Sequence, residues 1–199
     1  IIICPPFTSL ESSTKSTNIP IGAQNCSTEE EGALTGEISP KMLKALGVKY
    51  VIIGHSERRH ILNETNQQIN KKLKVAINNN LIPIFCVGET EKERLNQKTK
   101  QVLKNQLKVG LKGIKGNLII AYEPVWAIGT GKTATPEIAE EAHQFIRSQV
   151  PKSIPLLYGG SVKPENIKTL MQQPNIDGAL VGGASLNPNT FAEIIKNAR

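Results

Sequence analysis

A glutamate and a histidine each follow a short apolar run, where side chains of parallel β/α proteins commonly reach a site. Glu123 comes after Leu118–Tyr122, and His55 comes after Tyr50–Gly54, immediately before Ser56. A carboxylate there can remove a proton, and an imidazole can hydrogen-bond an oxygen on which charge develops. A helix beginning at Ser56 would place its positive dipole end beside the ring and favour neutral imidazole. We predict one acid–base site containing Glu123 and His55, with a purely structural histidine as the alternative.

The other titratable candidates are less distinctive. Glu57 precedes Arg58 and Arg59, so it is either catalytic itself or part of a buried ion-pair scaffold, the interpretation we favour. His60 and His143 have charged neighbours in the sequence, which indicates the surface.

Glycine-rich segments follow three of the apolar runs. The end of Gly129–Thr133 resembles a phosphate-binding P-loop, but that motif needs a glycine where Trp126 stands, so it is excluded. The longer segment Glu123–Thr135 has the composition of a mobile lid, with an ordinary loop as the alternative. Gly159-Gly160-Ser161 and Gly182-Gly183 precede possible helix starts, where backbone N–H groups can bind an anion or simply form tight turns.

Seven short apolar runs predict strands that are buried on both faces. They are Ile1–Cys4, Ile19–Ala23, Tyr50–Ile53, Ile82–Val87, Leu118–Tyr122, Ile154–Tyr158 and Gly178–Val181. Helical spacing of apolar residues between the runs predicts helices over 69–77, 95–107 and 138–146. Ser39, Thr135 and Asn187, each followed by proline, predict helix starts, and Gly47 predicts a helix end.

Alternating strands and helices predict an α/β protein with parallel strands, either an open doubly wound sheet or a closed barrel. Polar or glycine residues follow nearly every run, whereas an open sheet concentrates its ligand contacts at one switch point. We therefore favour a (β/α) barrel forming a single domain over residues 1–199.

Composition narrows the function classes. The 199 residues carry 24 Lys and Arg against 17 Asp and Glu, a net charge of +7, and no run approaches the length of a membrane span. With one tryptophan and scattered lysines, we expect no nucleic-acid partner and no membrane association; the charge either steers a small anionic substrate or is simply solvated. Three distant cysteines indicate a cytoplasmic protein without a metal site.

Six segments together resemble the triosephosphate isomerase family, in order along the whole chain. They are Ala23–Asn25, Gly36–Pro40, Gly54–Arg59, Ala121–Gly131, Tyr158–Ser161 and Leu180–Leu186. The resemblance implies a (β/α)8 TIM barrel that interconverts dihydroxyacetone phosphate and glyceraldehyde 3-phosphate in glycolysis and gluconeogenesis, without cofactor or metal.

The family's residues carry over by position. Glu123 matches the base, His55 the neutral electrophile and Glu57 an acidic residue near the site, so all three are assigned as catalytic candidates. The substrate-binding candidates match phosphate-gripping backbone groups, and they are Gly129, Ser161, Gly182 and Gly183. Pro124–Thr135 matches the closing lid. The loop Asn25–Glu37, with Thr35 at its tip, matches the segment that docks into a second copy, which implies a homodimer.

The departures from the family concern missing pieces. Matched to the family, Ile1–Cys4 is the second strand, so the first β/α unit and its Asn-x-Lys motif are absent from the sequence, and the connection Gln149–Ser153 is short. We expect the intact protein to contain the missing strand. If it does not, the loss of a lysine that stabilises the oxyanion would leave an impaired phosphate-binding fragment, the alternative function.

Overall fold

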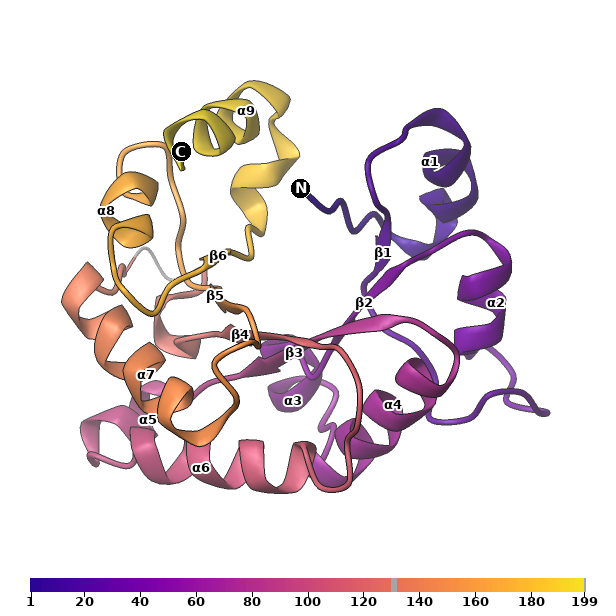
Figure 1. The fold of residues 1–199 in the computed structure, drawn as a ribbon, viewed down its shortest axis with the longest axis horizontal. Coiled ribbons are helices and arrows are strands. Elements are labelled where there is room, and N and C mark those ends of the chain that lie inside the picture. Colours follow the sequence, from indigo (N-terminus) through magenta and orange to yellow (C-terminus); the bar gives the residue numbers. More distant parts are fainter. Residues whose placement is uncertain (130–131, 199) are drawn as a thin grey trace. The chain divides into compact units, whose positions relative to one another are not determined.

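The structure is a computed structural model that describes residues 1–129 and 132–198. Its contacts divide the chain into two compact units. Unit 1 comprises Ile1–Cys86 and Lys108–Ile119, and unit 2 comprises Val87–Leu107 and Ile120–Arg199. Helices and strands alternate along the chain in both units (Figure 1), which confirms the predicted α/β class.

Unit 1 is built on three parallel strands, with β1 paired to β2 and β2 paired to β3. Its elements are η1 (Phe7–Ser9), α1 (Leu10–Ser16), β1 (Gly22–Ala23), α2 (Pro40–Ala45), β2 (Tyr50–Ile53), α3 (Ser56–His60), α4 (Asn66–Asn78) and β3 (Ile82–Val87). Val51, Ile53 and Phe85 of the strands are fully buried, as are Ile69 and Leu73 of α4. The helix α4 therefore covers the sheet with the apolar face that its sequence spacing predicts.

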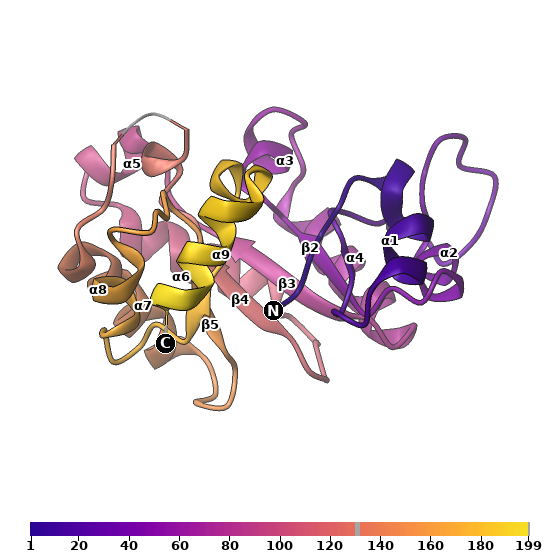
Figure 2. The same cartoon turned by 90° about the horizontal axis from the view of Figure 1, so that it is seen from above.

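Unit 2 is built on the parallel strands β4, β5 and β6, paired in chain order. Its elements are α5 (Glu91–Leu95), α6 (Thr99–Gly110, which ends in unit 1), β4 (Ile119–Tyr122), η2 (Val125–Ala127), α7 (Pro136–Gln149), β5 (Leu156–Tyr158), α8 (Ile167–Met171), β6 (Gly178–Ala179), η3 (Gly183–Leu186) and α9 (Pro188–Asn197). Helices α7 and α8 lie side by side, as both ribbon views show (Figures 1 and 2). Parallel pairing places the carboxyl ends of these strands, and the loops that follow them, at one edge.

The first predicted strand is wrong in extent. Within Ile1–Cys4 only Ile3 forms an isolated bridge, to Ile21. Two prolines directly follow Cys4, and Pro20 has no N–H to donate, so the ladder cannot lengthen in either segment. Among the described residues the strands thus number six, and the run Ile19–Ala23 contributes only Gly22–Ala23.

The predicted helix starts and the predicted helix end are confirmed. The side chains of Ser39, Thr135 and Asn187 each accept hydrogen bonds from backbone N–H groups in the first turn of the helix that follows. Gly47 has a left-handed φ of 82°, directly after the residue that caps α2. Local capping chemistry was therefore sufficient to place these ends.

Two helix-related predictions are wrong. Leu95 does not belong to the apolar face of α6, because it ends the separate helix α5 and is 78% exposed. His143 is fully buried in α7, not on the surface, and its Nδ1 lies 2.7 Å from the carbonyl oxygen of Ala139. Burial lowers the pKa of His143, which favours the neutral ring. The charged neighbours of His143 misled the prediction, although Ala139, His143 and Ile146 follow helical spacing.

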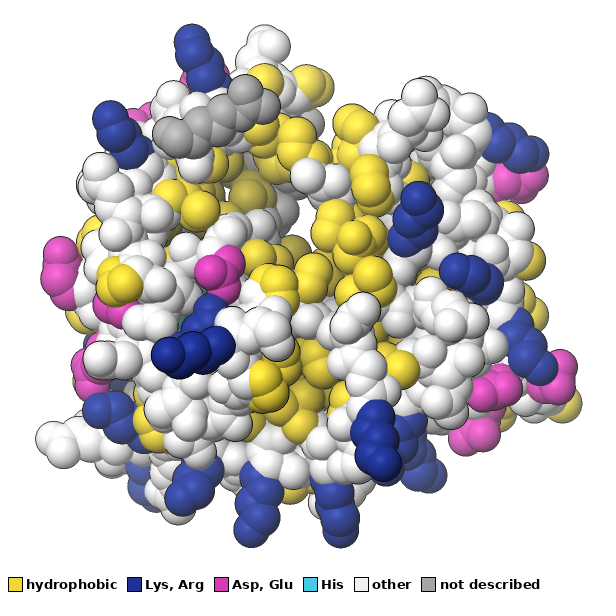
Figure 3. All heavy atoms as spheres, viewed as in Figure 1, with side chains coloured by type: hydrophobic (Ala, Val, Ile, Leu, Met, Phe, Trp, Pro, Cys, Tyr) yellow, Lys and Arg dark blue, Asp and Glu magenta, His cyan; other side chains and the backbone are white. Residues whose placement is uncertain are grey.

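The surface charge and the lengths of the helices are relevant to binding of nucleic acid and of membranes. Lysine and arginine side chains occur over several elements of the visible face and are densest along α6 (Figure 3). None of the helices within residues 1–129 and 132–198 is both long and apolar enough to cross a membrane.

Candidate functional site

Glu123 lies at the carboxyl end of β4, as predicted, and only 2% of its surface is exposed. Its backbone N–H donates a 2.8 Å hydrogen bond to the carbonyl oxygen of Val87. On the other side of the strand, the N–H of Gly159 donates to the carbonyl oxygen of Tyr122 at 2.7 Å. The backbone around Glu123 is thus fixed from both sides by neighbouring strand ends.

Gly88 and Gly159 lack side chains and so make room for Glu123. A Cβ atom on Gly88 would come within 1.7 Å of the Glu123 carbonyl oxygen, a distance that real Cβ atoms never show. A Cβ atom on Gly159 would come within 3.0 Å of the Glu123 Cγ atom. Gly88 therefore requires glycine for close packing, a reason distinct from turn formation, whereas a side chain at Gly159 would press on the Glu123 side chain and need it to shift.

A second buried carboxylate, Glu89, lies beside this strand end and was missed as a functional residue by the sequence analysis. Both of its oxygens accept from the Tyr122 hydroxyl at 3.1 Å, and Oε1 also accepts from Trp126 Nε1 at 3.0 Å. Arg94 Nη1 lies 3.6 Å from Oε1. Burial raises the pKa of Glu89, and the hydrogen bonds and the arginine oppose this rise.

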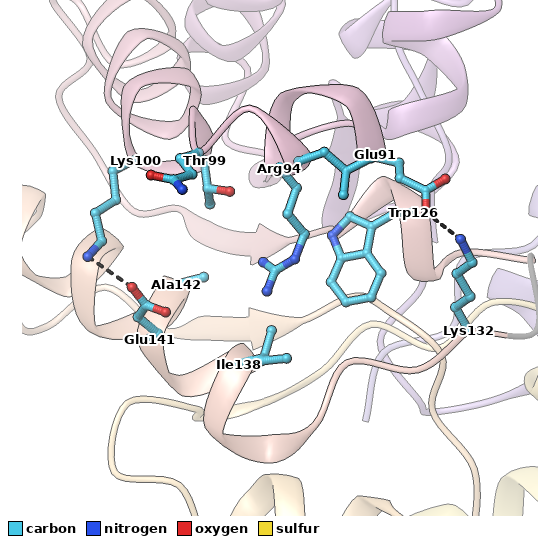
Figure 4. A pocket seen from close by; sticks show the side chains of 11 residues that line it. Glu91, Arg94, Thr99, Lys100, Trp126, Lys132, Ile138, Glu141 and Ala142 are labelled. Carbon is cyan, nitrogen blue, oxygen red and sulfur yellow. Dashed lines mark hydrogen bonds and ion pairs between the residues drawn. The ribbon is translucent and has the colours of Figure 1, made fainter.

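Trp126 also forms one wall of a cavity of about 740 Å³ (Figure 4). The guanidinium of Arg94 lies 4.7 Å from the centre of the Trp126 ring, within range of a cation–π contact. Ion pairs between Lys100 and Glu141 and between Lys132 and Glu91 border the same cavity. Trp126 is therefore held by Glu89 at its ring nitrogen and by Arg94 at its face.

The predicted lid, residues 124–135, includes this tryptophan. It opens with the short helix η2, whose Val125 N–H donates to the Glu89 carbonyl oxygen at 3.1 Å. Gly129 is exposed with a left-handed φ of 67°, and Thr135 caps α7. Thr130 and Gly131 lie outside the described residues.

Three of the predicted phosphate-binding residues follow the paired strands β5 and β6, namely Ser161 after β5, and Gly182 and Gly183 after β6. No described residue provides a hydrogen-bond partner to the backbone N–H of Ser161, Gly182 or Gly183. A Cβ atom added at Gly182 or Gly183 would meet nothing within 4 Å, and η3 begins at Gly183. Backbone N–H groups that lack partners at adjacent strand ends suit an anion.

His55 belongs to unit 1, where it follows β2 and caps α3. Its Nδ1 accepts a 3.3 Å hydrogen bond from the backbone N–H of Glu57, so the lone pair of Nδ1 is occupied. The Glu57 carboxylate lies 3.6 Å from the same nitrogen, which would suit a protonated ring instead. A separation of 3.6 Å exceeds hydrogen-bonding distance and the Glu57 side chain is 70% exposed, so the hydrogen bond that Nδ1 makes here is the one it accepts from the backbone N–H. The remaining ring proton is then assigned to Nε2.

Glu57 is not the buried scaffold that the sequence analysis favoured, because its side chain is mostly solvent-exposed. The buried acid of this region is instead Glu64, which pairs with Arg58 at 2.6 Å and with Lys72. Arg59 supports the strand ends of unit 1 by donating to the carbonyl oxygens of Gly54 and Cys86.

The predicted site residues divide between the units. Unit 1 contains His55 and Glu57, and unit 2 contains Glu123, Gly129, Ser161, Gly182 and Gly183. These features define an α/β enzyme with a buried carboxylate and candidate anion-binding loops after parallel strands.

Comparison with known proteins narrows this class. The family model described as triosephosphate isomerase matches residues 1–198. Triosephosphate isomerase of Carboxydothermus hydrogenoformans is 52% identical over 213 residues, which cover all of this chain and 85% of the relative. That of Clostridium tetani is 53% identical over 210 residues, covering 98% of this chain and 82% of the relative. The chain belongs to the triosephosphate isomerase family.

Proposed function

We propose that this chain interconverts dihydroxyacetone phosphate and D-glyceraldehyde 3-phosphate, with Glu123 as the base and His55 as the hydrogen-bond donor. The observation that carries the proposal is the buried side chain of Glu123 at a strand end, with its backbone close to Gly88 and its Cγ atom close to Gly159. Membership of the isomerase family at about 50% identity supports the enzyme over the alternative of an impaired phosphate-binding fragment.

In the proposed reaction, the Glu123 carboxylate takes a proton from C1 of dihydroxyacetone phosphate. The electron pair of the broken C–H bond forms the C1–C2 double bond, and the C2 oxygen takes the negative charge. His55 Nε2–H donates to the substrate oxygens and stabilises this enediolate. The hydroxyl proton passes from the C1 oxygen to the C2 oxygen, and protonated Glu123 returns its proton to C2, giving the aldehyde. No cofactor or metal takes part.

Phosphate recognition is assigned to backbone groups of the loops after β5 and β6. The N–H groups of Ser161, Gly182 and Gly183 would hold the phosphate, joined by Gly129 when the lid closes. Closure of residues 124–135 would exclude water and protect the enediolate from losing its phosphate. Glu57 is assigned an auxiliary acidic role near His55, consistent with the 3.6 Å separation of its carboxylate from Nδ1.

We also propose the complete architecture to be a single-domain (β/α)8 barrel whose first unit, with the Asn-x-Lys motif, is not in this sequence. Membership of the family and the parallel strands of both units support the barrel, and the match leaves 15–18% of these two relatives uncovered. An intact mass above 21.7 kDa for the purified protein would agree with it, and a mass equal to that value would refute it.

The loop over residues 25–37 is proposed to dock into a second copy, giving a cytoplasmic homodimer. Its base is anchored, since Asn25 Oδ1 accepts from the buried Lys72 at 2.8 Å. Further along, Leu34 is 45% exposed. Sedimentation equilibrium of wild type and Leu34→Glu tests this: the variant should dissociate at lower concentration, and unchanged dimerisation would argue for another interface.

The catalytic assignment is tested with Glu123→Asp, which withdraws the carboxylate by one methylene. We expect kcat to fall by about 100-fold or more, because misplacement by about 1 Å can cost that much. Affinity for glycerol 3-phosphate, a phosphate ester that does not react, should stay within about threefold. Glu165→Asp, at an exposed position, is the matched control. If the affinity for glycerol 3-phosphate falls as strongly as kcat in Glu123→Asp, Glu123 is structural.

A further inference from the structure

A glutamine of α6 forms a two-point hydrogen-bonded pair with a strand-end peptide in unit 2. Gln106 is 7% exposed, and its Nε2 donates to the Gly88 carbonyl oxygen at 2.9 Å. Its Oε1 accepts from the Gly88 N–H at 2.8 Å. Both hydrogen-bonding groups of one residue are thus satisfied by one side-chain amide, in the way that a neighbouring strand would satisfy them.

The residues on either side of Gly88 bond in the opposite direction. The carbonyl oxygens of Val87 and Glu89 accept from the N–H groups of Glu123 and Val125, at 2.8 and 3.1 Å. Alternate residues of a strand direct their polar groups to opposite sides, so the N–H and carbonyl groups of Gly88 point away from β4. Gln106 therefore binds the segment 87–89 on the side opposite to β4.

Gly88 is also in direct contact with the proposed base. Its α-carbon approaches the Glu123 carbonyl so closely that no side chain fits between them. A shift of Gly88 would move Glu123 and, through the carbonyl oxygen of Glu89, Val125 at the start of the lid. The contact between Gly88 and Glu123 is tight enough to transmit sub-ångström changes, because close-packed interiors deform little.

We infer that Gln106 is a positioning residue for Glu123, setting the place of its carboxylate through the peptide of Gly88. The inference rests on the proposed role of Glu123 as the base. Gln106 does not touch the substrate in this assignment, and its influence passes through backbone atoms alone.

The first test compares Gln106→Met with Gln101→Met, the same change at an exposed position of the same helix. At a temperature where circular dichroism shows both variants folded, we expect Gln106→Met to lower kcat by about 10- to 100-fold with KM within about threefold. Gln101→Met should stay within twofold of wild type in both constants. A Gln106→Met enzyme with kcat within twofold of this control would overturn the inference.

A second variant, Gln106→Glu, covers the case in which methionine prevents folding. A protonated glutamic acid accepts at one oxygen and donates at the other, as glutamine does, whereas a carboxylate opposes the Gly88 carbonyl oxygen. The ratio of variant to wild-type kcat should therefore rise toward one as pH falls. A ratio independent of pH would contradict the two-point role.

A double-mutant cycle separates this inference from the proposed base. If Gln106 acts through Glu123, its substitution should cost at least threefold less in a Glu123→Asp background, where the base is already misplaced. Equal costs in the two backgrounds would refute the coupling. If Glu123→Asp alone left kcat unchanged, the base assignment would fail instead, whatever Gln106 did.

Discussion

Removing the hydroxyl of Tyr122 measures how much the hydrogen bonds of buried Glu89 contribute to the stability of the fold. Tyr122→Phe removes one O–H group that donates to both oxygens of a carboxylate with no exposed surface. The ring stays in place, so the change leaves no cavity of the size that truncation to alanine would create.

The expected cost follows from the charge of the acceptor. Hydrogen bonds to charged groups contribute about 1.5–3 kcal/mol, so the free energy of unfolding should fall by that amount near pH 8. For a chain of this length, the melting temperature should fall by about 3–12 °C. Burial already raises the pKa of Glu89, and loss of the Tyr122 donor raises it further. A raised carboxyl pKa makes the free energy of unfolding fall as pH rises. The free energy of unfolding of Tyr122→Phe should therefore lie further below that of wild type at pH 8 than at pH 5.

Urea unfolding followed by circular dichroism at pH 5 and pH 8 measures this difference. Tyr50→Phe is the matched control: Tyr50 lies in β2, and no hydrogen bond of its hydroxyl is found among the described residues. The control should change stability by less than about 0.5 kcal/mol. The reasoning would be refuted if Tyr122→Phe matched the control, or if its cost were the same at both pH values.

Features determined by local chemistry could be predicted from the sequence. The caps at Ser39, Thr135 and Asn187 form within one helical turn, and the strand Ile82–Val87 is a run of apolar residues between polar ends. The position of Glu123 followed from the same rule, because a polar residue directly after a buried strand must lie at its carboxyl edge. Such features depend on few residues that are close in sequence.

Features determined by contacts between segments that are distant in the sequence could not be predicted from it. Gln106 pairs with a peptide 18 positions away, and Glu89 bonds to Trp126 across 37 positions. An apolar or polar residue type alone does not specify such a partner. The prediction of a strand over Ile1–Cys4 was wrong for a related reason. The length of a strand depends on the backbone hydrogen bonds that its partner can form, and here Pro20 limits them.

Two further predictions concern the glycines beside Glu123 and the buried histidine of α7. Gly88→Ala would drive a Cβ atom into the Glu123 backbone, so urea unfolding should show a loss above about 3 kcal/mol. Gly159→Ala meets chiefly the Glu123 Cγ atom at 3.0 Å, so it should cost less stability yet lower kcat about tenfold; the reverse order of stabilities would contradict this packing argument. His143→Phe should remove part of the acid sensitivity of the fold. Because burial lowers the pKa of His143, the unfolded chain binds a proton below about pH 6.5 that the folded chain excludes. Wild-type stability should therefore fall with decreasing pH from about 6.5, by at most about 1.4 kcal/mol per pH unit from this residue. Stability of the variant, measured by urea unfolding from pH 7.5 to 5, should fall less steeply, and equal slopes would mean that His143 is protonated alike in both states.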